Sequence, residues 1–246
     1  MRIDIVTIFP GYFASPLSES LLGRAVEKDL LRLHLVDLRD FAEPLHRKVD
    51  DEPYGGGPGM VMAAPPLFAA IEALRAEEPS PHVVFLSPQG RRFDAPAARR
   101  LAAHARLVLV CGRYEGIDDR ARQAGLFDEE ISLGDFVLSG GEVAALAVVE
   151  AVSRFVPGVV GDAESVALDS FEDGLLDYPH FTRPREFRGL AVPEVLFSGH
   201  HEKIRRWRRE RQLVETRRLR PDLLAGATLS DEDRSFLRVA GKPESL

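Results

Sequence analysis

The chain has 246 residues, a length that suits one or two globular domains. Of these residues 45% are hydrophobic and 29% are charged, with a formal net charge of −7, and this composition excludes a disordered chain. Its single cysteine excludes an intramolecular disulfide framework and a multi-cysteine metal site. No apolar run approaches the roughly 18 residues of a membrane span, and residues 1–4 lack the start of a signal peptide, so we expect a cytoplasmic protein with no membrane partner.

Strand-like and helix-like segments alternate over the first two-thirds of the chain. Ser15 and Pro16 are expected to open a helix, as its N-cap and its first residue. The wholly apolar segment 107–111 is typical of a strand buried on both faces. This alternation predicts an α/β fold with a mostly parallel sheet covered by helices. In chain order we predict strand 2–8, helix 15–26, strand 31–37, helix 65–75, strand 82–86, helix 94–105 capped by Asp94, strands 107–111 and 130–133, and helix 142–155.

The pattern changes after residue 158. The acidic stretch that follows has no sustained period, so we expect a linker or a mobile loop. Residues 199–218 predict a basic helix, and Ser230 and Asp233 have the spacing of a capping box before a last helix. The predicted parts are therefore an α/β domain at 1–160, a linker at 161–177 and a small all-helical C-terminal domain at 178–246.

Charge is distributed unevenly along the chain. Residues 183–220 hold 12 Arg and Lys against five Asp and Glu, whereas residues 115–177 hold 15 acidic residues against three arginines. Such asymmetry indicates a nucleic-acid surface on the basic part, although a solvated helix face explains it equally well.

Glycines gather in three short segments, at 53–59, 112–116 and 134–142. The latter two, and segment 87–90, follow predicted strands, so the three loops are expected to meet at the carboxyl edge of the sheet. Glycine lets the backbone approach a ligand closely. For any one segment, a tight turn without a ligand is the alternative.

Several familiar motifs are missing from the sequence. It has no P-loop, no dinucleotide-binding glycine motif after the first strand and no zinc-protease motif. His200 and His201 would point about 100° apart on a helix, which disfavours a shared metal. Cys111 ends the buried strand and is expected to be inert packing. We therefore predict no dedicated metal site.

Four segments carry a specific resemblance: 52–60 (EPYGGGPGM), 111–118 (CGRYEGID), 133–142 (LGDFVLSGGE) and 193–201 (PEVLFSGHH). In this order they resemble the bacterial tRNA (guanine-N1-)-methyltransferases of the TrmD family, which modify guanine 37 beside the anticodon. The resemblance implies a SPOUT-type, trefoil-knotted parallel-sheet domain, S-adenosylmethionine as cofactor, the tRNA anticodon arm as partner, and a homodimer whose site lies at the subunit interface. Some members of the family depend on Mg²⁺, so a role for that ion is left open.

The resemblance also implies which residues hold the cofactor. Phe136 stands where members of the family often have tyrosine, and because backbone recognition survives that change we expect little effect on binding. The implied cofactor-binding residues are Leu86, Ser87, Pro88, Gly112, Glu115, Leu133, Gly134, Asp135, Phe136, Val137, Leu138, Gly140 and Gly141.

By the same resemblance, the family's general base corresponds to Asp169 and its guanine-binding arginine to Arg154. Methyl transfer requires guanine N1 to lose its proton, which a carboxylate can accept. An arginine stabilises the negative charge that then develops on O6. Judged by the residues alone, Asp169 could be an ordinary solvated acid and Arg154 a cation that complements a helix dipole.

The basic C-terminal residues are expected to contact RNA phosphates in a salt-dependent way. Trp207 shares helical spacing with Ile204, which favours packing over base stacking. Two alternatives remain at this point: a non-catalytic RNA-binding protein on the same scaffold, and a knotted methyltransferase with a different RNA target. The predicted RNA-binding residues are Arg183, Arg185, Arg188, His201, Lys203, Arg205 and Arg208, with Arg206, Arg209 and Arg211 on the same helix.

Overall fold

The computed structural model describes residues 1–162, 166 and 168–240. The chain divides into two compact units, residues 1–163 and 164–246. In the described part of the chain, every helix is too short or too polar to cross a lipid bilayer.

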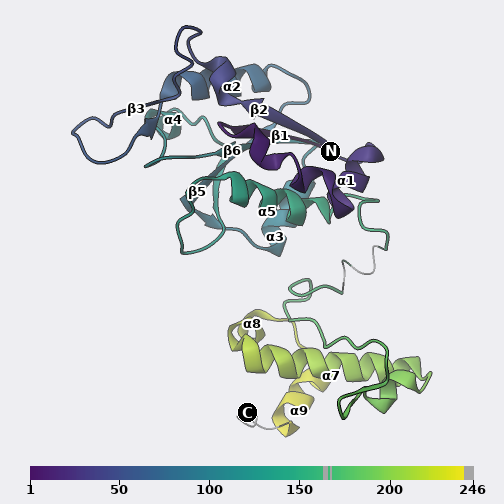
Figure 1. Cartoon of the computed structure of the whole chain (residues 1–246). Helices are drawn as coiled ribbons and strands as arrows, with labels where there is room; N and C mark the ends of the chain where they lie inside the picture. The colour runs from purple at the N-terminus through teal and green to yellow at the C-terminus, as the bar shows by residue number, and fades with distance from the viewer. Residues whose placement is uncertain (163–165, 167, 241–246) are drawn as a thin grey trace. The chain divides into compact units, whose positions relative to one another are not determined.

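The first unit is built on a five-stranded, all-parallel sheet in the order β2-β1-β6-β5-β7 (Figure 1). The central strand β6 is buried along its whole length, which confirms the prediction of a strand covered on both faces. The α/β class with a parallel sheet is therefore confirmed, while the trefoil knot stays a prediction. The strands are β1 (Arg2–Thr7), β2 (Arg32–Asp37), β5 (His82–Arg92), β6 (Arg106–Cys111) and β7 (Glu129–Ser132).

Helices cover both faces of this sheet (Figure 1). Side chains alternate along β1, so that Ile3 and Ile5 join one core cluster while Val6 and Ile8 join the other. The first cluster lies under α1 (Ser20–Glu27), α3 (Ala95–Ala102) and α5 (Glu142–Ser153), and the second under α2 (Ala64–Arg75) and α4 (Arg120–Gln123).

The predicted start of the first helix is wrong. Ser15 has a helical backbone and its side chain caps nothing. Pro16–Ser18 form a short 3₁₀ turn, and α1 begins only at Ser20, whose left-handed φ of 54° interrupts the chain between them. In contrast, the prediction for Asp94 is confirmed, because its Oδ1 accepts a hydrogen bond from the Ala97 amide at 2.8 Å.

Strand β5 runs well beyond its predicted end at residue 86. It passes through Pro88 and Gly90 and pairs again with β7 after a shift in register. A Cβ atom at position 90 would lie 2.4 Å from the backbone nitrogen of Ile131, so only glycine allows this close approach. The part of β5 around Gly90 is therefore held tightly against β7.

The first unit also has a small antiparallel pair, β3 (Asp50–Asp51) with β4 (Val61–Met62). This pair closes the base of the glycine-rich loop 53–59. The chain around it contains two 3₁₀ turns, Pro10–Phe13 and Leu38–Phe41.

The second unit contains α7 (His201–Leu219), α8 (Pro221–Gly226), α9 (Asp231–Val239) and the 3₁₀ turn Glu194–Phe197. The capping box predicted at Ser230 and Asp233 is confirmed. The prediction of an all-helical domain needs one correction, because β8 (Glu186–Phe187) and β9 (Leu190–Ala191) form an antiparallel hairpin. Arg188 and Gly189 both have positive φ there, as in the tight turns that suit hairpins.

The predicted linker is in part packed within the second unit. Leu175 is fully buried, and the Leu176 amide donates a hydrogen bond to Oγ1 of Thr216 on α7 at 2.9 Å. Residues 163–165 and 167 of that linker lie outside the described residues.

Candidate active site

A cavity of about 380 Å³ opens at the carboxyl ends of β5, β6 and β7. Its walls are segment 85–89, where β5 shifts its pairing register with β7, and the segments at the ends of β6 and β7, at 112–117 and 131–141. Ligands of parallel α/β proteins bind at this edge of the sheet. The structure thus brings together the loops that the sequence placed after strands, and all the predicted cofactor-binding residues except Asp135 line the cavity.

Two glycines hold the second and third loops in direct backbone contact. The Gly141 amide donates a hydrogen bond to the carbonyl of Gly112 at 2.8 Å. A Cβ atom at position 141 would lie 2.7 Å from the Cα of Cys111, at the end of β6. No side chain fits between these two backbones, so glycine is required for this wall of the cavity.

The third loop presents apolar side chains to solvent at the rim. Gly134 begins it with a φ of 152°, and its amide donates to Oγ of Ser132, whose hydroxyl donates to the Gly134 carbonyl. Phe136 and Val137 are then exposed, the latter to 84%. Exposed apolar groups at the mouth of a cavity are suited to cover an apolar part of a ligand.

Segment 85–89 is held by polar contacts of the Ser87 side chain. The hydroxyl of Ser87 accepts a hydrogen bond from the Gln89 amide at 3.2 Å and from Arg122 at 3.5 Å. Arg122 is anchored in turn by its bond to Glu130 at 2.8 Å and by stacking on the ring of Phe85. This arginine, from α4, forms a charged part of the cavity wall.

The glycine-rich loop 53–59 reaches the site through Glu115. Gly59 has a φ of 81°, and a Cβ atom there would lie 2.4 Å from Oε1 of Glu115. The Glu115 amide donates to the carbonyl of Met60 at 3.0 Å. Only the end of the loop, at Gly59 and Met60, contacts the second loop, while Tyr54 and the glycines at 55–57 are exposed and do not line the cavity.

Cys111 and Glu142 are the buried titratable groups behind this wall. Burial raises the pKa of the Cys111 thiol well above its usual value, with the Glu142 charge adding to the effect, so this thiol is a poor nucleophile. Glu142 is only 1% exposed and is paired with Arg113 at 3.0 Å.

Among the polar residues of the cavity wall that sequence reasoning missed are Arg113, Tyr114 and Arg122. The first two lie inside segment 111–118, so the motif itself could have indicated them. Arg122 comes from the four-residue helix α4, which has no recognisable pattern.

The structure places the two predicted catalytic residues in different units. Arg154 is the C-cap residue of α5 in the first unit. Asp169 is half-buried in the second unit, where its amide donates to the carbonyl of Val166 at 3.3 Å. Neither residue lines the cavity.

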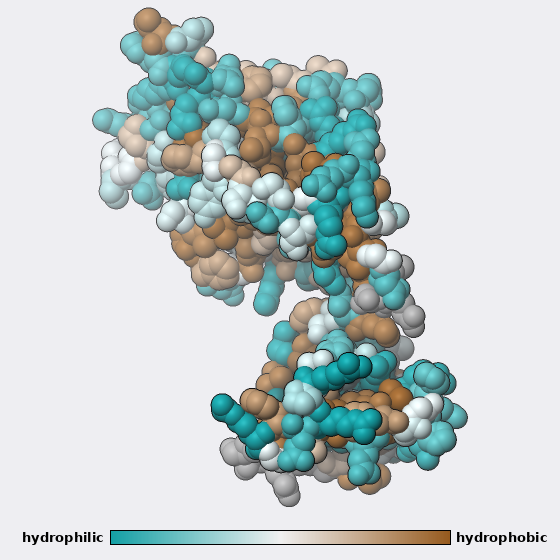
Figure 2. Space-filling view, turned by 45° about the vertical axis from the view of Figure 1, so that its right-hand side comes forward, coloured by the Kyte–Doolittle hydropathy of each residue, from teal (hydrophilic) through white to brown (hydrophobic). Residues whose placement is uncertain are grey.

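Most predicted RNA-binding residues are exposed in the second unit, whose visible face in Figure 2 carries many hydrophilic side chains. Four arginines lie against aromatic rings, Arg185 over Phe197 at 4.6 Å, Arg188 over Phe187, Arg208 over Tyr178 and Arg211 over Trp207.

Arg209 and Trp207 of α7 contact other parts of the second unit. Arg209 is a correction to the prediction, because both Asp233 and Asp173 hold its guanidinium in internal ion pairs. Trp207 is half-buried against Phe181, with ring centres 6.2 Å apart, as expected for packing. Across the described residues, no group of three His, Cys, Asp or Glu side chains is arranged to hold a metal.

Known proteins resemble the chain over nearly its whole length. The family model described as tRNA (Guanine-1)-methyltransferase TrmD matches residues 1–226. The tRNA (guanine-N(1)-)-methyltransferase of Geobacter sulfurreducens is 55% identical over 97% of each chain. The protein of the same name from Moorella thermoacetica is 52% identical over 99% of this chain and 98% of its own.

A solved structure has the same fold. The crystal structure of tRNA (m1G37) methyltransferase from Aquifex aeolicus matches with a TM-score of 0.74 and 39% sequence identity. The match covers 92% of this chain and 95% of that one.

Proposed function

The chain belongs to the tRNA (guanine-1)-methyltransferase TrmD family, and we propose that it transfers a methyl group from S-adenosylmethionine to N1 of guanine 37 in tRNA, beside the anticodon. Family membership makes it a tRNA (guanine-N1)-methyltransferase and not a non-catalytic RNA-binding protein. The methyl donor, the position of the guanine and the residues that act on it are the proposed part.

The observation that supports this proposal best is the convergence of three loops on one cavity. Its volume of about 380 Å³ lies in the range of small-molecule sites, about 300–1,000 Å³. Gly112, Gly140 and Gly141 line it without side chains, so that a ligand can approach the backbone closely, and Leu86, Leu133 and Leu138 supply apolar walls. A nucleoside with a short charged tail fits such a mixture of backbone groups and apolar surface. When bound, S-adenosylmethionine supplies a methyl group that its sulfonium already activates.

The enzyme's own residues must accept the proton that leaves guanine N1 and stabilise the negative charge that develops on the base. Asp169 accepts the proton from guanine N1, because a neutral ring nitrogen is a poor nucleophile until that proton leaves. Arg154 donates to O6, where the negative charge of the deprotonated base gathers. On the resemblance to the family, we place the complete site at the interface of a homodimer.

The second unit binds the anticodon arm in this proposal. Its exposed arginines and Lys203 neutralise phosphates, which gives affinity with little sequence preference. Arg185 and Arg208 lie over the rings of Phe197 and Tyr178, and planar groups held in this way suit the splayed bases of an RNA loop. Whether transfer requires Mg²⁺ is an open question, which an assay in EDTA with and without added Mg²⁺ answers.

Methyl transfer to defined transcripts tests the proposal. The purified protein is incubated with methyl-labelled S-adenosylmethionine and either a tRNA transcript with guanine 37 or the same transcript with adenine 37. We expect 1-methylguanosine in digests of the first transcript and no label in the second. Label at another nucleoside, or on a ribose oxygen, would contradict the proposed position and chemistry.

A further inference from the structure

Glu142 is a carboxylate buried directly behind the cavity wall. It is the first residue of α5, follows Gly140 and Gly141, and is 1% exposed. A buried carboxylate is costly unless it is paired and hydrogen-bonded. The helix dipole favours an acid at this position, but it does not require the specific partners that Glu142 has.

Both carboxylate oxygens of Glu142 are bound, and each bond leads to a different segment. Oε1 accepts from the hydroxyl of Thr7 at 2.8 Å, and Oε2 accepts from Nε of Arg113 at 3.0 Å. Thr7 ends β1 and is fully buried, while Arg113 lies in the loop that follows β6. Glu142 therefore joins the end of β1, the loop at 112–116 and the end of the loop at 134–141.

The Glu142–Arg113 pair lies against the backbone of Gly140. A Cβ atom at position 140 would be 2.1 Å from Nε of Arg113 and 2.5 Å from Oε2 of Glu142. The pair thus fills the space that a side chain would need there. Gly140 and Arg113 also line the cavity, so a shift of this pair would move the wall.

Arg113 is held in one orientation by two contacts. Its Nε is bound to Glu142, and its guanidinium carbon lies 4.5 Å from the centre of the Phe9 ring. Its terminal nitrogens make no hydrogen bond to any residue within the described ranges, and the side chain is 22% exposed. The buried carboxylate therefore fixes an arginine whose outer edge remains available at the cavity.

We propose that Glu142 is a positioning residue of the methyl-donor site. It holds Arg113 against Gly140, and so keeps the loops at 112–116 and 134–141 at the spacing that a bound cofactor needs. This inference rests on the proposed function for the identity of the ligand. It predicts that weakening the Glu142 contacts lowers the affinity for S-adenosylmethionine before it lowers the amount of folded protein.

The test compares Glu142→Gln with Glu150→Gln, an exposed acid on the same helix. Calorimetry gives the Kd of S-adenosylmethionine, and steady-state transfer to tRNA gives KM and kcat separately. For Glu142→Gln we expect the Kd and KM for the cofactor to rise about tenfold, the loss typical of one charge-assisted hydrogen bond. Glu150→Gln should match the wild type. A purely structural role would lower the folded fraction and kcat but leave KM unchanged, and that result would overturn the inference.

Thr7→Val and Thr7→Ser keep the test decisive if Glu142→Gln does not fold. Thr7→Val removes one hydrogen bond to Glu142 without changing any charge, and should raise the cofactor KM about fivefold. Thr7→Ser keeps the hydroxyl and should restore the wild-type KM. Equal KM values for both variants and the wild type would overturn the inference while leaving the proposed function standing. Failure of the wild type to bind S-adenosylmethionine would instead refute the proposed function, and the inference with it.

Discussion

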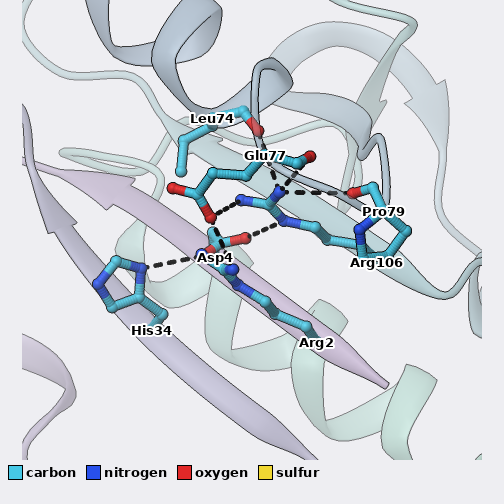
Figure 3. A network of polar contacts seen from close by, with 7 residues as sticks. All are labelled: Arg2, Asp4, His34, Leu74, Glu77, Pro79 and Arg106. Carbon is cyan, nitrogen blue, oxygen red and sulfur yellow. Dashed lines mark hydrogen bonds and ion pairs between the residues drawn. The ribbon is translucent and has the colours of Figure 1, made fainter.

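Arg106 and Asp4 form an ion pair in which both side chains are fully buried, with Nε of Arg106 2.8 Å from Oδ2 of Asp4 (Figure 3). The pair joins the first residue of β6 to the middle of β1 at the end of the sheet opposite the loop at 112–116. A buried ion pair offsets the cost of removing both charges from water only when the other hydrogen-bonding positions of the two side chains are also filled. Those positions are taken by Arg2, His34, Leu74, Glu77 and Pro79.

Asp4→Asn should destabilise the protein by about 3–5 kcal/mol, because it takes the buried carboxylate from Arg106 and leaves the half-exposed Glu77, 3.2 Å away, as its charged partner. Urea denaturation measures the loss. The Kd of S-adenosylmethionine should stay at the wild-type value, since the pair lies far along the strands from the cavity. Arg32→Gln, which breaks an exposed pair with Asp29, should leave the urea midpoint nearly unchanged. Equal midpoints for the two variants would contradict the role given to the buried pair.

The network around Arg106 also shows what sequence patterns cannot provide. The apolar run 107–111 predicts a buried strand correctly, because a strand covered on both faces needs a continuous apolar sequence. Nothing local links Arg106 to Asp4, which lies on another strand. Such pairs depend on strand order, and the order β2-β1-β6-β5-β7 cannot be read from hydrophobic periodicity.

The candidate site likewise has parts that the sequence predicts and parts that it does not. The loops at 112–116 and 134–141 are predictable, because glycines after parallel strands meet at one edge of the sheet. Arg122 is not predictable from α4, and Pro88 and Gly90 suggest a strand end where β5 in fact continues. The roles of Arg154 and Asp169 come from the resemblance alone, since an arginine at a helix end and an acid in an acidic stretch are ordinary.

Asp169→Asn should lower kcat for methyl transfer by about 10²–10⁴-fold, because the amide cannot accept the proton of guanine N1. The Kd of S-adenosylmethionine should not change, since Asp169 does not line the cavity. Single-turnover transfer and calorimetry measure the two effects. Asp173→Asn is the matched control, because that acid pairs with Arg209 and should affect stability without affecting the rate per folded enzyme. Wild-type kcat for Asp169→Asn would rule out Asp169 as the base.

Gly141→Ala should abolish cofactor binding, because the new methyl group would lie 2.7 Å from the Cα of Cys111 and force two backbones apart. Calorimetry with S-adenosylmethionine measures the loss, and a thermal melt reports whether the rest of the fold survives. Gly11→Ala is a suitable control, since a Cβ atom there has nothing within 4 Å. Normal binding by Gly141→Ala would mean that the two loops need not touch when the cofactor is bound.

Asp233 should make the stability of the second unit depend on acid pH. The Arg209 guanidinium, helped by the Ser230 amide, lowers the pKa of this carboxyl despite its partial burial. A lowered pKa means that the stabilisation is complete above the unfolded pKa of about 4 and is lost as the pH falls through the lower folded value. Asp233→Asn should therefore cost about 1–3 kcal/mol at pH 7 and much less near pH 2. Urea titrations of both proteins at the two pH values measure the difference, and an equal cost at both would refute the linkage.

Arg205→Gln should weaken tRNA binding and flatten its salt dependence if the exposed face of α7 contacts phosphates. Removing one such contact lowers the slope of log K against log salt by about 0.7–0.9. Filter binding of tRNA across a series of KCl concentrations measures the slope. Arg218→Gln is the control, because Arg218 is also exposed on α7 but pairs with Glu215 near the end of the helix and is not among the predicted contacts. A slope equal to the wild type for Arg205→Gln would show that this face of α7 does not contact the RNA. If Arg205 neutralised a phosphate, that phosphate would keep its counterion when the variant binds, and the slope would fall.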